Sequence, residues 1–354
     1  MKVGILGAGQ LARMLTLAAK PMGIDTISFV ENPNEASNGI TPIFHLGWHD
    51  PNAFSAFSKE VSVLTFETEN IPTDLFNKFT IDCPVYPNIK TLKITQDRLL
   101  EKEFLTSLQI PTAEFIAIES IRDLSNYKNF PAILKTRCMG YDGKGQFLIR
   151  NTEEAQQAFE NLKTESLILE SFVQFDLELS LIAIRSVSQE TKFYPLTQNQ
   201  HREGILFLSE APLIDPPLQR NAETIANKIL DAVDYVGVLA IEMFQVGDQL
   251  LINELAPRVH NSGHWTIEGA VTSQFENHIR AILDLPLGST EPLGYSAMIN
   301  MIGNLFDRNE ILKIPYTHWH DYEKSPRPNR KLGHITLNVS DKNIYNQCLE
   351  KILA

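Results

Sequence analysis

The sequence has few cysteines, no excess of positive charge and no long apolar run, and each absence excludes a class of protein. Cys83, Cys138 and Cys348 lie far apart and lack CxxC spacing, so we expect neither a disulfide framework nor a zinc site. With 31 basic and 43 acidic residues, the formal net charge of -12 argues against a general nucleic-acid binder. No segment approaches the roughly 18 apolar residues of a membrane helix, and glycines stand where a signal peptide would be apolar. We therefore expect a cytoplasmic protein with no nucleic-acid or membrane partner.

The composition that remains is that of an ordinary enzyme, long enough for two or three domains. The chain opens with an apolar strand at residues 2–6, a GxGxxA turn leading into an amphipathic helix, and a second strand at residues 26–30. This order predicts a parallel, doubly wound α/β domain that ends near residue 92. The turn also matches a dinucleotide fingerprint with Glu31 as the ribose-binding acid, so a dinucleotide-dependent oxidoreductase is one interpretation. The same turn serves any ligand whose polar group approaches a helix N-terminus.

Two acids, Glu67 and Glu69, follow another buried strand at residues 61–66. Open α/β sheets bind ligands at the C-terminal ends of their strands, so one of these acids is expected to contact substrate. The alternative is a solvated loop charge, or a charge at a helix N-terminus, ahead of Pro72.

A glycine-rich hairpin is predicted between strands at residues 132–136 and 146–149, and Lys135 lies on its first strand. Three glycines, Gly140, Gly143 and Gly145, make the connection suitable as a flexible cover over phosphates. It is not a Walker A loop, because Lys144 is followed by glycine and then by a strand. A plain hairpin turn is the alternative interpretation.

The densest group of polar side chains lies in residues 250–266, LLINELAPRVHNSGHWT, after a predicted hairpin. A turn centred on Asp248 puts Glu242 directly opposite Glu254, and like charges at such a distance destabilise a sheet. Either a divalent cation lies between them, or one carboxyl is protonated or salt-bridged, for example to Arg258. Mg²⁺ binds one or two carboxylates and completes its shell with substrate phosphates, so a nucleoside triphosphate is the expected partner.

The remaining pattern predicts helices at residues 91–107, 151–163, 221–236 and 271–283, and a loop at residues 198–204. A strand at residues 177–181 carries Glu178, which is either functional or an exposed strand position. Near the end, a cluster of Lys324, Arg327, Arg330 and Lys331 contrasts with the acidic chain. It is either an anion site or a solvated surface patch.

Four motifs carry a resemblance to a known family: GAGQLARML (7–15), GYDGKGQ (140–146), NELAPRVHNSGHWT (253–266) and the frame RPxRKxGH (327–334). Together they resemble the ATP-grasp superfamily and, within it, the N5-carboxyaminoimidazole ribonucleotide synthetases of purine biosynthesis. The resemblance covers essentially the whole chain. Asn329 departs from it, because the family usually has glycine there.

The resemblance implies an α/β fold, α+β overall, with ATP-grasp architecture. A Rossmann-like N-terminal domain would span residues 1–92, and an ATP-grasp domain residues 93–285, with a small mobile lid at about 112–175. A small β-rich C-terminal domain would span residues 286–354. A homodimer is also expected from the family.

The implied activity is ATP-dependent carboxylation of 5-aminoimidazole ribonucleotide with bicarbonate. Glu242 and Glu254 would hold Mg²⁺, or Mn²⁺ in its place, and Asp142, Arg258, His260 and Asn261 would line the bicarbonate and amine side. The residues implied at ATP are Arg98, Lys135, Gly140, Tyr141, Asp142, Gly143, Lys144, Gly145, Gln146, Glu170, Ser171, Phe172, Val173, Glu178, His201, Asn253 and Glu254. Those implied at the ribonucleotide are Gln10, Leu11, Glu67, Asn261, Lys324, Arg330 and Lys331. A related carboxylase or ligase acting on biotin or another amine stays open, beside the oxidoreductase.

Overall fold

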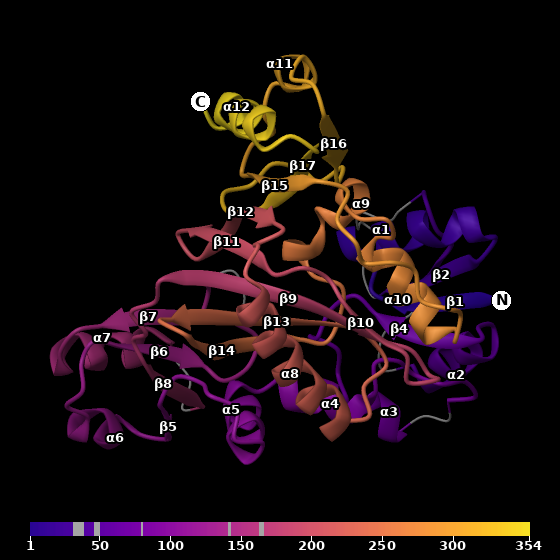
Figure 1. The fold of residues 1–354 in the computed structure, drawn as a ribbon. Helices are drawn as coiled ribbons and strands as arrows, with labels where there is room; N and C mark the ends of the chain where they lie inside the picture. Colours follow the sequence, from indigo (N-terminus) through magenta and orange to yellow (C-terminus); the bar gives the residue numbers. More distant parts are fainter. Residues whose placement is uncertain (31–38, 46–49, 79–80, 141–142, 163–165) are drawn as a thin grey trace.

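The computed structural model describes the chain except for residues 31–38, 46–49, 79–80, 141–142 and 163–165. Within this described part the strands form three sheets. Figure 1 shows the N-terminal sheet on the right, the glycine-hairpin sheet at the lower left, and the C-terminal elements at the top of a long central sheet.

The N-terminal sheet is parallel, with the order β3-β2-β1-β4, as the doubly wound prediction requires. Its core contains the fully buried rings of Phe29, Phe54, Phe57 and Phe66. Apolar strands alternate with amphipathic helices here, which is the pattern that covers a parallel sheet on its faces. Its elements are β1 (Lys2–Leu6), α1 (Gln10–Ala19), η1 (Lys20–Met22), β2 (Asp25–Val30), β3 (Ile43–His45), α2 (Pro51–Lys59), β4 (Val63–Phe66) and α3 (Leu75–Lys78).

The second sheet contains the predicted glycine hairpin, with Lys135 on β6 paired to Gln146 on β7. It is antiparallel in the order β5-β8-β6-β7, and two helices pack on its apolar side chains. We call this unit the lid sheet. Its elements are β5 (Phe115–Ile118), α6 (Ile121–Asn126), β6 (Ala132–Thr136), β7 (Gln146–Ile149), α7 (Thr152–Leu162) and β8 (Leu167–Ser171).

The central sheet has nine strands in the order β14-β13-β9-β11-β12-β15-β17-β16, with β10 beside β9. Because β12 pairs with β15, the strands after residue 286 continue this sheet and do not form a separate one. The strands are β9 (Leu177–Arg185), β10 (Thr191–Phe193), β11 (Thr197–Arg202), β12 (Ile205–Ala211), β13 (Gly237–Val246), β14 (Gln249–Ala256), β15 (Tyr295–Ile302), β16 (Thr317–Asp321) and β17 (Lys331–Val339).

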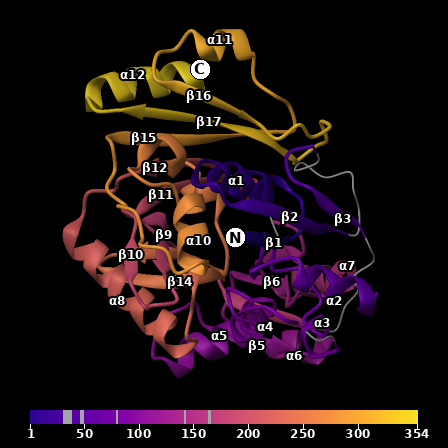
Figure 2. The same ribbon diagram turned by 90° about the vertical axis from the view of Figure 1, so that its right-hand side faces the viewer.

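Helices cover both faces of the central sheet, because alternate residues of β9 and β13 point to opposite sides. On one face, α1 and α10 lie side by side and share an apolar core (Figure 2). The other face packs against α5 and α8. The elements not yet named are α4 (Ile89–Thr95), α5 (Arg98–Ser107), α8 (Pro216–Ala232), η2 (Asn261–Gly263), α9 (Thr266–Gly269), α10 (Gln274–Ile282), α11 (Arg308–Leu312) and α12 (Lys342–Leu353).

Several predicted boundaries are wrong, and capping side chains explain most of them. The helix expected at residues 91–107 is two helices, because Asp97 leaves the helical conformation and accepts the N–H of Leu99. The helix expected from residue 221 starts at Pro216, where Asp215 caps it. The helix expected from residue 271 starts after the cap Ser273.

The loop predicted at residues 198–204 is mostly the strand β11, which turns at Glu203 and Gly204. Its polar composition is misleading, because the buried Asn199 exchanges hydrogen bonds with Ser180 and Ser209 on the neighbouring strands. None of the helices in the described part of the chain has the length and apolarity that a membrane crossing needs.

Candidate active site

A cavity of about 960 Å³ lies where the N-terminal sheet, the lid sheet, the central sheet and the basic loop at residues 324–331 meet. Nearly all of the described residues predicted for the site line it. They are Gln10, Leu11, Glu67, Arg98, Lys135, Gly140, Gly143, Lys144, Gln146, Glu170, Ser171, Phe172, Val173, Glu178, His201, Glu242, Asn253, Glu254, Arg258, His260, Asn261, Lys324, Arg330 and Lys331. Gly145 is not part of the lining and lies against Thr136 instead. The predicted Tyr141 and Asp142 are outside the described residues.

Glu242 and Glu254 lie opposite each other on β13 and β14, as predicted. The reason differs from the prediction. From the turn outward, Val246 pairs with Gln249 and Met243 with Ile252, so the hairpin is not centred on Asp248. A β-bulge then adds Asn253 as an unpaired residue, and this addition brings Glu254 opposite Glu242.

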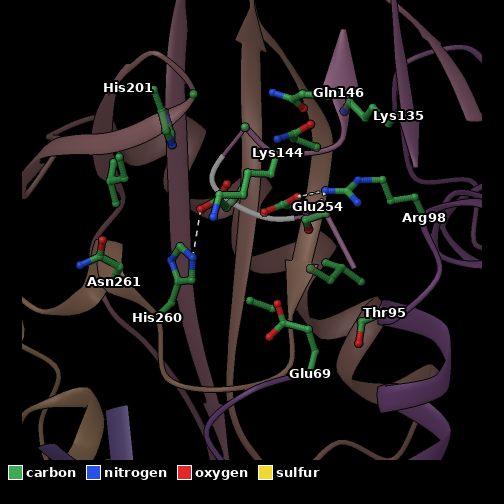
Figure 3. Close-up of a pocket in the computed structure, with 18 of the residues that line it drawn as sticks. Glu69, Thr95, Arg98, Lys135, Lys144, Gln146, His201, Glu254, His260 and Asn261 are labelled. Atoms are coloured by element: carbon green, nitrogen blue, oxygen red, sulfur yellow. Dashed lines mark hydrogen bonds and ion pairs between the residues drawn. The ribbon is translucent and has the colours of Figure 1, made fainter. Parts of the chain in front are cut away.

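A basic side chain approaches this carboxylate pair at one end, and a neutral histidine contacts it at the other (Figure 3). Arg98 Nη2 lies 3.8 Å from Glu254 Oε2, and His260 Nε2 lies 3.2 Å from Glu242 Oε1. The N–H of Ser262 points to His260 Nδ1, which places the ring proton on Nε2, so that Nε2 donates to Glu242. Burial and the nearby Arg258 hold the pKa of His260 well below its usual range. Arg258 was suggested as a salt-bridge partner of this pair, but it contacts Glu69 instead.

Burial and the charge of Glu254 raise the pKa of Glu242 to about 7. Without a cation, the protonated form of Glu242 is therefore favoured, which is one of the alternatives predicted for the facing pair. The described residues contain no cluster of three or more His, Cys, Asp or Glu side chains that could hold a metal by themselves. An ion at the carboxylate pair would need further ligands, which Mg²⁺ commonly takes from phosphates.

Arg258 pairs instead with Glu69, through contacts of 2.5 Å from Nε to Oε2 and 3.1 Å from Nη2 to Oε1. Burial would raise the pKa of Glu69, but Arg258 lowers it overall. This bidentate pair fixes the guanidinium beside His260 and Asn261. Asn261 is held in turn by reciprocal amide hydrogen bonds of 3.2 Å and 2.7 Å with Asn300.

On the lid side, Lys135 Nζ donates to Glu170 Oε2 at 2.9 Å. Burial would raise the pKa of Glu170, but Lys135 and Lys102 lower it overall. Farther along the cavity, the rings of Phe175 and Phe244 stack with centroids 4.6 Å apart. Glu178 Oε2 lies 2.8 Å from His201 Nδ1, so the acid on β9 has a partner within the cavity.

The GxGxxA turn is occupied by a side chain of the chain itself. Glu67 accepts the N–H of Gly9 and, at 2.9 Å, that of Ala12 at the start of α1. A Cβ on Gly7 or Gly9 would come within 2.6 Å or 2.7 Å of the Glu67 side chain, which explains both glycines. A dinucleotide pyrophosphate would need the same helix N-terminus, so this geometry argues against the oxidoreductase interpretation.

The basic loop contacts α1 of the N-terminal domain, so its cationic side chains face the ligand cavity on that side. Lys324 donates to the side-chain oxygen of Gln10, and Arg13 pairs with Glu323 at 2.8 Å. Asn329 has φ +61, a left-handed conformation that asparagine tolerates, which explains how it can stand where the family usually has glycine. The loop therefore keeps the shape that presents Arg330 and Lys331 to the cavity.

Several lining residues were not predicted. Glu101 and Phe244 had no signal in the sequence, because acids on helices and aromatic residues on strands are usually structural. Lys102, buried beside the cavity, was missed for the same reason. Glu69 had a signal, since it lies in the loop after β4 that was expected to face ligand.

Family comparisons agree along the whole chain. Residues 1–96 match the ribonucleotide synthetase preATP-grasp domain, residues 103–275 the ATP-grasp domain, and residues 296–347 the phosphoribosylaminoimidazole carboxylase C-terminal domain. The chain is 44% identical to the N5-carboxyaminoimidazole ribonucleotide synthase of Pseudomonas aeruginosa over 97% of this chain and 96% of that protein.

Solved structures give the same result. The N5-carboxyaminoimidazole ribonucleotide synthetase of Thermus thermophilus is 45% identical, with a TM-score of 0.93 over 99% of this chain and 97% of that one. An Aspergillus clavatus synthase in complex with ADP and 5-aminoimidazole ribonucleotide is 28% identical, with a TM-score of 0.89 over 99% and 98%. The chain therefore belongs to the N5-carboxyaminoimidazole ribonucleotide synthase family of ATP-grasp ligases.

Proposed function

We propose that the chain carboxylates the amine of 5-aminoimidazole ribonucleotide with bicarbonate, consuming ATP, in the de novo synthesis of purine nucleotides. The observation that carries the proposal is one cavity lined by a carboxylate pair, a lysine beneath a glycine hairpin, and a basic loop. These three features match the needs of a metal-bound triphosphate and a second, singly phosphorylated substrate. The Aspergillus clavatus relative, solved with ADP and the aminoimidazole ribonucleotide, supports the same pair of ligands.

ATP would lie between the lid sheet and the central sheet. Its adenine would lie beside the strand end at Phe172 and Val173 and near the stacked rings of Phe175 and Phe244. Its phosphates would meet Lys135, Arg98 and the glycine hairpin. This division is supported by the positions of these residues in the cavity lining and by the apolar character of the ring stack.

Glu242 and Glu254 would hold Mg²⁺, or Mn²⁺. The fit rests on two facing carboxylates whose negative charge the nearby Arg98 only partly offsets, and oxygen ligands are what these ions prefer. When bound, the ion would neutralise the charge that develops on the phosphate oxygens.

The chemistry calls for charge stabilisation and exclusion of water, and needs no protein nucleophile. A bicarbonate oxygen attacks the γ-phosphorus, ADP leaves, and carboxyphosphate forms. The substrate amine then captures the carboxyl carbon, either from carboxyphosphate or from CO₂ released from it, and phosphate leaves. Arg258, held by Glu69, would orient bicarbonate, while His260, Asn261 and Asp142 would line the amine side.

The basic loop would bind the monophosphate of the ribonucleotide through Lys324, Arg330 and Lys331, and Gln10 would orient the ribonucleotide from α1.

We further propose the domain division 1–92, 93–285 with its lid at about 112–175, and 286–354. We also propose a homodimer, which light scattering after size-exclusion chromatography would test.

ADP release measured with Mg²⁺ and bicarbonate, with and without the aminoimidazole ribonucleotide, tests the activity. We expect release that requires bicarbonate and is strongly stimulated by the ribonucleotide, together with incorporation of labelled bicarbonate into product. Equal stimulation by biotin or by an unphosphorylated amine would instead favour another carboxylase of this superfamily. Absence of ADP release with all substrates present would contradict the proposal.

A further inference from the structure

The orientation of Glu254 depends on the bulge in β14. Without the bulge, the pairing that starts at the turn would place Asn253 opposite Glu242 and Glu254 opposite Ile241. Ile241 is fully buried in the core on the opposite face of the sheet. A shift of one residue reverses the face of every side chain beyond it, so Glu254 would point away from the cavity. The bulge is therefore what gives the carboxylate pair its geometry.

The polar backbone groups around this bulge are satisfied by two consecutive residues of α5. Lys102 Nζ donates to Asn253 O at 2.7 Å and to Ile252 O at 3.1 Å. On the other side of the bulge, Glu101 Oε2 accepts the N–H of Leu255 at 3.2 Å. The buried groups of an irregular strand need such partners, because each one left unpaired keeps the full cost of its lost hydration.

Lys102 is only 1% exposed, and its three N–H bonds all have partners. The third goes to Thr112 Oγ1 at 2.7 Å, and that hydroxyl itself donates to Ile252 O at 2.7 Å. The positive charge lies 3.9 Å from Glu170 Oε2, the same oxygen that accepts from Lys135 of the lid sheet. An aliphatic side chain would fill this space without desolvating a charge, so an ammonium here calls for a reason beyond packing.

We propose that Lys102 is a positioning residue whose ammonium holds the bulge at Asn253 and so directs Asn253 and Glu254 into the cavity. The inference rests on the proposed function, in which Glu254 meets the metal-bound nucleotide. Lys102 itself does not line the cavity. It acts through the backbone carbonyls of Ile252 and Asn253, and through Glu170 it also joins the floor of the cavity to the lid sheet.

Lys102→Met tests the proposal, because methionine keeps the unbranched shape and removes the three donors. Mn²⁺ binding in the presence of ADP, followed by electron paramagnetic resonance, measures the metal site without turnover. We expect Mn²⁺ affinity to fall by at least about tenfold, as when other partners of metal ligands are removed. ADP binding without metal should change by less than about threefold, since the contacts to the base are untouched.

Leu105→Ala is the matched control, because Leu105 is fully buried on the same helix and its aliphatic side chain can donate no hydrogen bond to the carbonyls of the bulge. It should lower the melting temperature while leaving Mn²⁺ affinity near the wild-type value. If Lys102→Met also lowers only the melting temperature, Lys102 is structural and the proposal is wrong.

Thr112→Val is the milder variant if Lys102→Met does not fold. It removes the hydroxyl that links Lys102 to Ile252 O, and it should weaken Mn²⁺ binding in the same direction by a smaller factor. Unchanged affinity in a folded Thr112→Val protein would then overturn the proposal. Failure of the proposed function would be seen separately, as a wild-type protein that binds Mn²⁺ and ADP but does not carboxylate the ribonucleotide.

Discussion

The cavity contains two kinds of largely buried carboxylate, and they differ in whether the protein supplies a cation. Glu69 and Glu170 each contact a basic side chain, and although burial would raise their pKa values, Arg258 and Lys135 lower them overall. Glu242 instead meets a neutral histidine and faces Glu254. Burial and the charge of Glu254 raise its pKa to about 7.

This difference separates carboxylates that orient other groups from carboxylates that are themselves ready for a ligand. A paired carboxylate fixes a guanidinium or an ammonium in one geometry and has little remaining affinity for a cation. In the facing pair, burial and the charge of Glu254 favour the protonated form of Glu242, and an incoming cation would displace that proton. The comparison can be tested by removing a member of the facing pair and by changing the pH.

The largest effect is expected from Glu254→Gln, which removes half of the facing pair. Mg²⁺-dependent ADP formation should fall by roughly a hundredfold or more, while the fold remains intact by circular dichroism. Glu350→Gln, an exposed acid on α12, is the control and should retain wild-type turnover. Near wild-type turnover in Glu254→Gln would contradict the metal-binding role of the pair.

Arg330→Ala should act on the other substrate. Loss of a charged hydrogen bond costs about 1.5 to 3 kcal/mol, so KM for the ribonucleotide should rise while KM for ATP stays nearly constant. Steady-state kinetics with each substrate varied in turn would measure both values. Lys351→Ala, at an exposed position on α12, is the control.

Two results would count against this assignment. If neither KM changes, the basic loop is solvated surface. If only KM for ATP rises, the loop binds the phosphates of the nucleotide.

A smaller effect is expected where the lid sheet contacts the turn between β11 and β12. Gly204 has φ +77, and a Cβ there would come 2.9 Å from Gly143 Cα. Gly204→Ala should therefore displace the glycine hairpin and raise KM for ATP by roughly fivefold to tenfold, or about 1 to 1.4 kcal/mol.

Gly23→Ala provides the matched control for backbone strain, because Gly23 has φ +69 with nothing within 4 Å of the added Cβ. It should cost stability without changing KM for ATP. Equal effects of both substitutions on KM would show that contact with the lid sheet is not involved.

The smallest effect is the pH dependence of stability in the protein without ligand. The raised pKa of Glu242 means that the folded state binds its proton more tightly than the unfolded state. Its contribution to the stability of the folded state is fully present below the ordinary glutamate pKa of 4.5 and is lost as the pH rises through about 7. Glu69 and Glu170 act in the opposite sense, since their contribution is present above 4.5 and is lost as the pH falls through their lowered pKa values.

Melting curves of wild type and Glu242→Gln between pH 5 and pH 8 would separate these contributions. The wild type should lose stability relative to Glu242→Gln as the pH rises across this range. Parallel curves would show that Glu242 titrates as an ordinary exposed acid.

The α/β opening, the glycine hairpin, the carboxylate pair and the basic loop carry their own signals in the sequence. Much of the remaining lining, such as Glu170 and His201, was predicted only from the resemblance to the family. The opposition of Glu242 and Glu254 was predicted for an incomplete reason, since a bulge cannot be recognised from an alternating pattern alone. Pairs distant in sequence, such as Glu69 with Arg258, depend on how separate sheets are brought together. Lys102 was missed because a lysine within an amphipathic helix is usually exposed.

The most direct test of the account is the number of protons released when Mg²⁺ and ADP bind. Isothermal titration calorimetry at pH 6.5, in buffers of different ionisation enthalpy, gives this number for wild type and for Glu242→Gln. The difference between the two proteins removes the protons that the nucleotide itself releases. We expect wild type to release on the order of half to one proton more, because cation binding ionises Glu242. Equal release by the two proteins would contradict the claim that the facing carboxylates receive the cation.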